Sequence, residues 1–232
     1  MIQVTSSIGS YCLALKDYNQ SQNIYLGKKM RIRKHNFLQL LNDKILVIAK
    51  PVINGKKNVK AMINLFSKDQ LSYSFELDYT ILTKQVFEKI FKNQKSILID
   101  NKEADKCLPN IDIINIDNYN FKVKIYPFNI NHCLGHFEDY PIVPSVLVLD
   151  CLIFGIKKWF QINNKNTLNL IIDSVELFLN KAMPIQKSYH SNILIRQNSL
   201  QSTMFLCEIK DNDCENYGNY IIIIENNYEK NN

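Results

Sequence analysis

The feature that most constrains the fold of this chain is the apolar segment VPSVLVLDCLIFGI at residues 143–156. The segment is fourteen residues long, whereas a helix that spans a bilayer needs about 20. The pattern stays apolar on nearly every face from residue 144 to residue 160, and Pro144 suits the first turn of a helix. A helix that is apolar all round must be wrapped by other structure. We therefore expect a sheet curled around a central helix.

One carboxylate, Asp150, interrupts this apolar segment. Burying a carboxylate among apolar side chains costs several kcal/mol unless it finds a partner. His136 precedes Asp150 by fourteen residues, and Pro141 and Pro144 lie between them. Taken singly, His136 could be a loop histidine bonded to backbone, and Asp150 could bind a buried polar group. Taken together, the two residues are the main candidates for catalysis.

The segment GHFEDYPIVPSVLVLD at residues 135–150 resembles a family motif. That family is the hotdog-fold beta-hydroxyacyl-(acyl carrier protein) dehydratases, whose motif is roughly GHFPGxPxxPGxLxxE, with Asp as the last residue in one branch. The chain departs from the motif at Glu138 and Asp139, which replace Pro-Gly, and at Ser145, which replaces glycine. The resemblance implies an α+β fold in which an antiparallel sheet wraps around a central helix. The matching residues are His136, Phe137, Pro141, Pro144, Leu147 and Asp150.

Strand patterns on both sides of the segment agree with that fold. Alternating residues on either side of an Asp-Asn turn predict a hairpin before the helix. Several strands are predicted after the helix, and a hairpin followed by a helix and further strands is the hotdog order. The hairpin is predicted at residues 111–116 and 121–125, and the later strands at 168–178, 191–196, 204–209 and 220–225.

The first half of the chain repeats part of this pattern at an offset close to 146 residues. Residues 2–16 take the place of the central helix, and Gln3 lies close to the position of Asp150. The opening hairpin and a counterpart of the His136 loop are missing from this half. We expect either a true start upstream of Met1, which we favour, or an abbreviated repeat. The repeated strands are predicted at residues 24–33, 44–49, 61–66 and 72–77.

The predicted architecture is therefore a double hotdog. Residues 1–82 would form a partial first repeat, and residues 83–107 a linker with a short helix at 84–92. Residues 108–226 would form a complete second repeat, and residues 227–232 a disordered tail.

The resemblance also implies catalytic roles. In the family, the histidine removes the proton next to the thioester carbonyl, and the acid delivers a proton to the departing 3-hydroxyl. His136 can act as a base near neutral pH, and apolar surroundings would keep Asp150 protonated. The N–H groups of Ser145 and Val146 would stabilise the thioester oxygen. The acyl chain would lie near Phe137, Val146, Leu149 and Ile153.

The dyad is not complete within one hotdog unit. In the family, the histidine of one unit works with the acid of its partner unit. His136 would then face Gln3, and Asp150 would face the missing loop of the first repeat. Three alternatives remain open at this point: an upstream extension, a homodimer or hetero-oligomer with another hotdog subunit, or loss of catalysis.

The formal charge of +6 suits an acidic partner. Alternation places Lys29, Arg31 and Arg33 on one face of a strand, where they could dock acyl carrier protein or simply be solvated. The sequence contains no basic stripe interleaved with aromatic residues, so it does not indicate a nucleic-acid partner.

The six cysteines are scattered, without metal-ligand spacing, and no signal peptide is evident. We expect reduced thiols, a cytoplasmic protein, and no metal or other cofactor. We expect structural roles for His132 and for Cys133, which resembles a small buried residue more than a nucleophile.

The predicted function is reversible dehydration of a 3-hydroxyacyl thioester, carried by acyl carrier protein, to the trans-2-enoyl thioester. The first alternative is a catalytically silent hotdog subunit that binds acyl chains or pairs with an active dehydratase. The second is an acyl thioesterase, in which the same carboxylate would activate water. The histidine at this spacing argues against the thioesterase.

Overall fold

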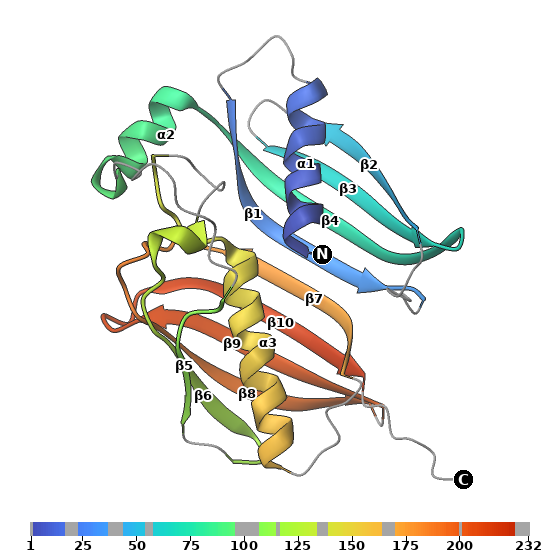
Figure 1. Cartoon of the computed structure of the whole chain (residues 1–232), viewed down its shortest axis with the longest axis vertical. Coiled ribbons are helices and arrows are strands. Elements are labelled where there is room, and N and C mark those ends of the chain that lie inside the picture. Colours follow the sequence, from blue (N-terminus) through green and yellow to red (C-terminus); the bar gives the residue numbers. More distant parts are fainter. Residues whose placement is uncertain are drawn as a thin grey trace. The chain divides into compact units, whose positions relative to one another are not determined.

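The computed structural model describes residues 2–16, 23–36, 44–53, 58–95, 107–114, 117–133, 139–163, 170–199 and 201–225. The chain divides into two compact units (Figure 1). One unit comprises residues 1–90 with residues 173–178, and the other comprises residues 91–172 and 179–232.

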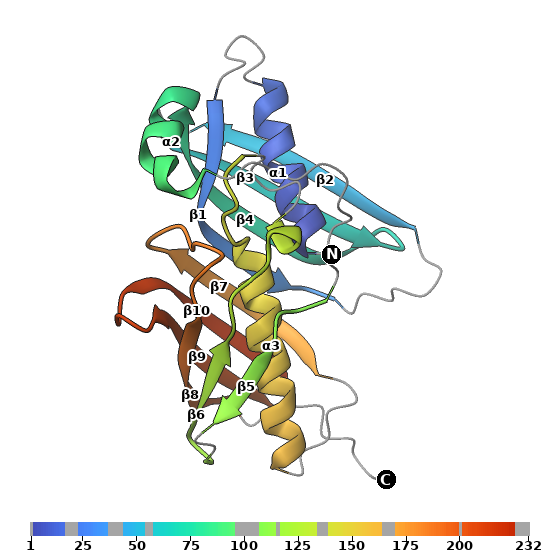
Figure 2. The same ribbon diagram turned by 60° about the vertical axis from the view of Figure 1, so that its left-hand side comes forward.

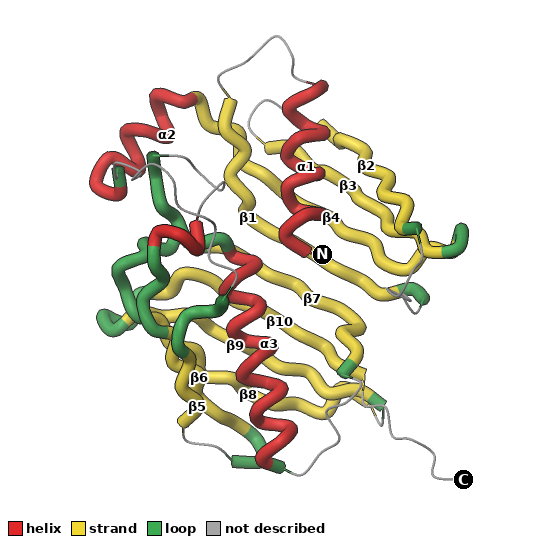
Figure 3. Tube along the Cα trace, in the orientation of Figure 1, coloured by secondary structure: helices red, strands yellow, loops and turns green. Residues whose placement is uncertain are grey.

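The first unit is one helix on an antiparallel sheet. Its strands are hydrogen-bonded in the order β2-β3-β4-β1, and residues 174–178 of β7 pair with β1. The helix α1 contacts β2, β3 and β4, and Figure 3 shows it lying along these strands. The elements are α1 (Ile2–Lys16), β1 (Asn23–Lys34), β2 (Ile45–Ile53), β3 (Asn58–Ser67), β4 (Gln70–Thr83) and the short helix α2 (Lys84–Phe91).

The second unit repeats this plan and adds a hairpin. Its strand order is β7-β10-β9-β8-β6-β5, where residues 173–178 of β7 are grouped with the first unit, and α3 lies along one face of the strands (Figure 2). The elements are β5 (Ile111–Ile114), β6 (Asn120–Ile125), a 3-10 turn at Ile130–Cys133, α3 (Ser145–Ile162), β7 (Ile171–Leu179), β8 (Tyr189–Ser199), β9 (Ser202–Asp211) and β10 (Asn216–Glu225). Each predicted strand is present, with its ends shifted by a few residues.

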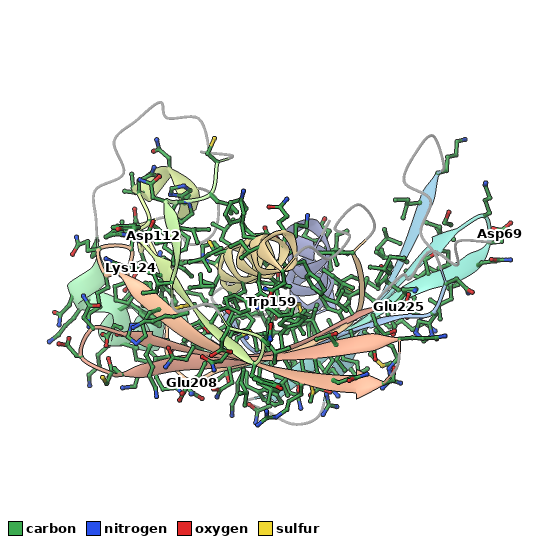
Figure 4. All side chains as sticks on the ribbon, turned by 90° about the horizontal axis from the view of Figure 1, so that it is seen from below. Asp69, Asp112, Lys124, Trp159, Glu208 and Glu225 are labelled. Atoms are coloured by element: carbon green, nitrogen blue, oxygen red, sulfur yellow. The ribbon has the colours of Figure 1, made fainter. Side chains whose placement is uncertain are left out.

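Trp159 anchors the C-terminal half of α3 to the sheet. Figure 4 shows Trp159 between the helix and the strands, whereas Glu208 lies on the opposite side of the sheet. The indole is buried, its N–H donates to the Asp117 carbonyl at 2.9 Å, and its ring stacks on Phe121. A buried indole needs such a hydrogen-bond partner. Trp159 thus packs α3 against the sheet and also holds, through its hydrogen bond, the connection between β5 and β6.

The two units share one strand order. β8-β9-β10-β7 in the second unit corresponds to β2-β3-β4-β1 in the first. The second unit adds β6 beside β8, with β5 outside it. Within the described residues, β3 is the only neighbour of β2. The β5–β6 hairpin therefore has no counterpart in the described part of the first unit.

A glycine marks the same place in both central helices. A Cβ on Gly155 would lie 2.6 Å from Val123 Cγ2, and one on Gly9 would lie 2.9 Å from Leu77 Cδ1. Both helices therefore approach their sheets too closely for a side chain at this position. The two glycines are 146 residues apart, so Val4, next to Gln3, takes the position of Asp150 in the first helix.

The state of the cysteines and the length of the helices can be compared with what the sequence predicted. All six cysteines are free thiols. Burial raises the pKa of Cys133 and of Cys151 to about 12, so both thiols stay protonated at neutral pH. The expectation that Cys133 is a structural residue is thus supported. No helix in the described ranges is both long enough and apolar enough to cross a membrane.

Candidate functional site

The start of α3 presents unpaired backbone donors. Pro144 precedes the helix in an extended conformation, and its carbonyl accepts from the Leu147 N–H at 3.0 Å. The first N–H groups of a helix have no acceptor within the helix. Nothing in the described part of the chain accepts from the N–H of Ser145 or Val146. The helix dipole adds partial positive charge here, so this end suits an oxygen that gains negative charge.

Buried contacts hold this helix start. Ile142 forms a β-bridge with Pro184, and the Val143 N–H donates to the Met183 carbonyl at 2.9 Å. In addition, the Tyr220 hydroxyl donates to the Ser145 carbonyl at 3.1 Å. The donors are therefore placed by the sheet and by the segment that follows β7.

Asp150 is exposed, so the expected burial in apolar surroundings is wrong. The helix is not apolar all round but has one open stripe at three- and four-residue spacing. Gly155 faces Val123 on the sheet, and Asp150 is turned about 140° from it around the helix. The sheet covers one side of α3, which is why a carboxylate is tolerated on the other. The exposed residues of the stripe are Asp150, Phe154, Lys157, Lys158 and Gln161.

The carboxyl of Asp150 is nevertheless partly shielded from water. Partial burial raises its pKa above the ordinary value, and the positive charge of Lys157 opposes this shift. The carboxyl group is therefore partly desolvated and still accessible to water. A carboxylate in this setting can be reached by water and is a stronger base than a fully solvated one.

The other predicted site residues differ in their surroundings. Val146 and Leu149 are buried, whereas Ser145 and Ile153 are half-buried. All four lie on α3, in the same helix as Asp150. His136 and Phe137 lie outside the described residues, and so does the side chain of Gln3. Their predicted roles remain predictions.

His132 is a structural residue, as expected. Its Nδ1 accepts from the Asn129 N–H at 2.9 Å, so its Nε2 carries the hydrogen and donates to the Cys107 carbonyl at 2.8 Å. The side chain is buried. Both ring nitrogens are engaged, which leaves none for proton transfer to a substrate.

The basic face of β1 is partly neutralised. Lys29 and Arg33 alternate with buried residues on the same side as Arg31. Arg31 Nε lies 3.4 Å from Glu176 Oε1, and Lys29 Nζ lies 4.4 Å from the centre of the Phe178 ring. Arg33 is exposed and has no ion pair with any described residue. Its cation is the most available of the three for a partner.

A buried charged network at the β9–β10 turn was not predicted from the sequence. Asp211 is buried, and its Oδ1 accepts from the N–H groups of Asp213 and Glu215, each at 3.0 Å. Its Oδ2 accepts from Tyr217 Oη at 3.1 Å and from Lys187. Burial alone would raise the pKa of Asp211, but these hydrogen bonds outweigh it and lower the pKa to about 2. The composition of residues 210–219 predicts a loop. It does not show that Lys187, which lies 24 residues from Asp211, pairs with it.

The described residues contain no cluster of His, Cys, Asp or Glu that could hold a metal ion. The site is built instead from backbone donors, one carboxylate and apolar side chains.

Comparison with solved structures identifies the fold. The chain is similar to an acyl-CoA thioesterase II, TesB2, from Mycobacterium marinum, with a TM-score of 0.54 and 8% identity over 90% of this chain and 83% of that one. It is similar to a 12:0-ACP thioesterase from Umbellularia californica, with a TM-score of 0.58 and 8% identity over 90% and 75%. It is also similar to a conserved protein with a hot dog fold from Alicyclobacillus acidocaldarius, with a TM-score of 0.53 and 7% identity over 87% and 79%.

No protein-family model matches the sequence, and no curated protein sequence does either. Identities this low show the fold alone. The protein is therefore an α+β double hotdog, as predicted, with a helix on an antiparallel sheet in each repeat. The expected membership of the dehydratase family finds no support in these comparisons, in which the enzymes named above are thioesterases.

Proposed function

We propose that this protein hydrolyses acyl thioesters, with Asp150 as the general base. The observation that carries the proposal is a water-accessible carboxylate with a raised pKa, five residues from the free donors at the start of α3. Dehydration would need Asp150 as a protonated acid, which burial would favour. Exposure favours the ionised form, which suits the activation of water. The thioesterase activity of similar folds supports the same choice.

The proposed reaction has two steps. Asp150 removes a proton from a water molecule, whose oxygen attacks the thioester carbonyl carbon. The negative charge on the carbonyl oxygen is stabilised by the N–H groups of Ser145 and Val146. The carbon–sulfur bond then breaks, and Asp150 returns the proton to the leaving sulfur. The products are a carboxylic acid and a free thiol.

The acyl chain in this proposal lies along α3 near Val146, Leu149 and Ile153. The thioester is carried by coenzyme A or by acyl carrier protein. Arg33, with Lys29 and Arg31, would contact an acidic carrier. If so, Arg33→Glu raises KM for a carrier-bound substrate by about 10-fold and leaves KM for the coenzyme A thioester unchanged.

Dehydration is the second candidate, because His136 and Asp150 stand at the spacing of the dehydratase motif. A silent acyl-binding subunit, alone or paired with another hotdog protein, is the third. It is favoured by the helix α1, which has no acidic residue at the position that Asp150 takes in α3.

Two parallel assays on the full chain test these functions. One measures thiol release from saturated and 3-hydroxyacyl thioesters, and the other measures enoyl absorbance from the 3-hydroxyacyl thioesters. We expect thiol release from both substrates without enoyl absorbance. Enoyl formation without thiol release would establish the dehydratase instead. Retained acyl binding with neither product would establish the silent subunit.

A further inference from the structure

Two sets of buried contacts converge on residues 142–145, at the start of α3. We propose that Tyr220, together with the Lys187–Asp211–Tyr217 network, positions the N-terminus of α3 and so aims the Ser145 and Val146 donors. This inference rests on the proposed function, since it concerns the group that those donors would stabilise. None of these side chains needs to touch the substrate. They are positioning residues.

The first contact is direct. Tyr220 lies in the centre of β10, opposite Cys207 of β9, and is 1% exposed. Its hydroxyl donates to the Ser145 carbonyl at 3.1 Å. A buried phenol without a partner is costly, and burial raises the pKa of Tyr220, so the hydroxyl keeps its proton for this bond. The sheet core therefore holds the first residue of the helix.

The second contact is relayed through the segment after β7. The Tyr189 hydroxyl donates to the Pro184 carbonyl at 2.6 Å, and Pro184 is bridged to Ile142. Next to it, the Met183 carbonyl accepts from the Val143 N–H at 2.9 Å. Residues 183 and 184 thus make the backbone contacts that hold residues 142 and 143, just before Pro144.

The Asp211 network holds residues 183 and 184 through contacts of Tyr189 and Lys187. Tyr189 packs edge-on against Tyr217, with ring centroids 5.3 Å apart. Lys187 donates to Oδ2 of Asp211, and Tyr217 Oη lies 3.1 Å from the same oxygen and 2.9 Å from Glu215 Oε2, so its single proton is shared between the two carboxylates. Lys187 belongs to the same connection as Pro184, so its ion pair ties that connection to the β9–β10 turn.

The two oxygen atoms of the Asp211 carboxylate have different partners, and this difference supports a role for Asp211 beyond the turn. Oδ1 accepts from the N–H groups of Asp213 and Glu215, and backbone bonds of Asp211 with Cys214 and Glu215 complete the turn. Among the described residues, Oδ2 contacts Lys187 and Tyr217, which lie outside the turn itself. A residue needed only to close a hairpin would not require the second set of bonds.

Tyr220→Phe is the sharpest test, because it removes one hydroxyl and keeps the ring in the core. We expect kcat for thioester hydrolysis to fall about 10-fold with KM within about two-fold, since misplaced donors weaken the transition state alone. Hydrogen exchange of residues 142–147 should become faster. Lys187→Met should reproduce both effects in smaller measure.

Two controls separate positioning from general destabilisation. Tyr126→Phe also removes one phenol hydrogen bond, to Asp112 at 2.7 Å, but on an exposed hairpin. Ile63→Val removes one buried methyl group from the first unit and so lowers its stability, at a side chain that is 0% exposed. Both controls should leave kcat and the exchange of residues 142–147 unchanged.

The outcomes also separate this inference from the proposed function. If the native protein releases no thiol, the proposed function fails, and faster exchange at residues 142–147 in Tyr220→Phe still supports the positioning role. If the native protein is active but Tyr220→Phe changes neither kcat nor exchange, the positioning role is wrong. An equal loss of kcat in Ile63→Val would also overturn it.

Discussion

At the scale of single residues, two aspartates have opposite environments and opposite pKa shifts. Asp150 is exposed, and partial burial of its carboxyl raises its pKa. Asp211 is buried and has a pKa lowered to about 2 by its donors. The difference arises because donors favour the ionised form more than burial opposes it. Of the two, only Asp150 combines water access with basicity.

Asp150→Asn should lower kcat for thioester hydrolysis by at least about 100-fold, because the amide cannot accept the proton of water. Its folded pKa is raised, so the stability linked to it is present below the unfolded pKa of about 3.9 and lost as pH rises through the folded pKa. The variant should therefore be as stable as the native protein at pH 7, or more so. Steady-state kinetics and urea unfolding measure the two effects. Unchanged turnover would remove Asp150 from the mechanism.

Asp211→Asn should cost about 2 kcal/mol at pH 7, since the charged hydrogen bond with Lys187 is lost. The folded pKa of about 2 lies below the unfolded value, so this stability is present above pH ~4 and lost as pH falls to about 2. Urea unfolding at pH 7, 4 and 2 should show a smaller acid dependence in the variant. An equal acid dependence would show that other carboxylates govern it.

At the scale of elements, the central helices depend on how closely they approach their sheets. A Cβ on Gly155 would lie 2.6 Å from Val123 Cγ2, and a Cβ on Gly9 would lie within 3.2 Å of Leu77, Tyr79 and Ile63. Helix propensity alone favours alanine over glycine by about 1 kcal/mol. Close packing overrides that preference in both repeats.

Gly155→Ala should therefore destabilise the protein by about 1–3 kcal/mol, despite its better helix propensity. Gly27→Ala in β1 is the matched control, because no atom lies within 4 Å of its added Cβ. Chemical unfolding of both variants measures the difference. In a double-mutant cycle, Val123→Ala should recover part of the loss by removing the clash. Additive effects would contradict direct contact between these positions.

At the scale of the whole molecule, the two repeats share a strand order but not a site. The second repeat has the β5–β6 hairpin and Asp150. The first has Val4 at the equivalent helix position, and β2 has a single neighbour within the described residues. Repetition of the fold therefore does not repeat the chemistry.

A chain with one candidate site should bind one molecule of a non-hydrolysable acyl thioester analogue. Titration calorimetry of the full chain should give a stoichiometry near one, and Asp150→Asn should retain it, since that substitution removes a proton acceptor and leaves the apolar residues of α3 in place. Two equivalents per chain would show that the first repeat also binds acyl groups. Such a result would place the function in both repeats.

The strands, the repeat and the position of the central helix could be predicted from periodicity, because the spacing of apolar residues is set locally by each helix or strand. The hotdog fold class was predicted from the resemblance of residues 135–150 to a family motif. The structural roles expected for His132 and Cys133 agree with their burial.

Only the tertiary structure decided how exposed Asp150 is and which residues hold the start of α3. The apolar run around Asp150 suggested burial on all sides, but the sheet covers one side of the helix. Tyr220 lies 75 residues from Ser145, and Lys187 lies 24 residues from Asp211. Contacts at such separations depend on strand register and helix rotation, which no local pattern specifies.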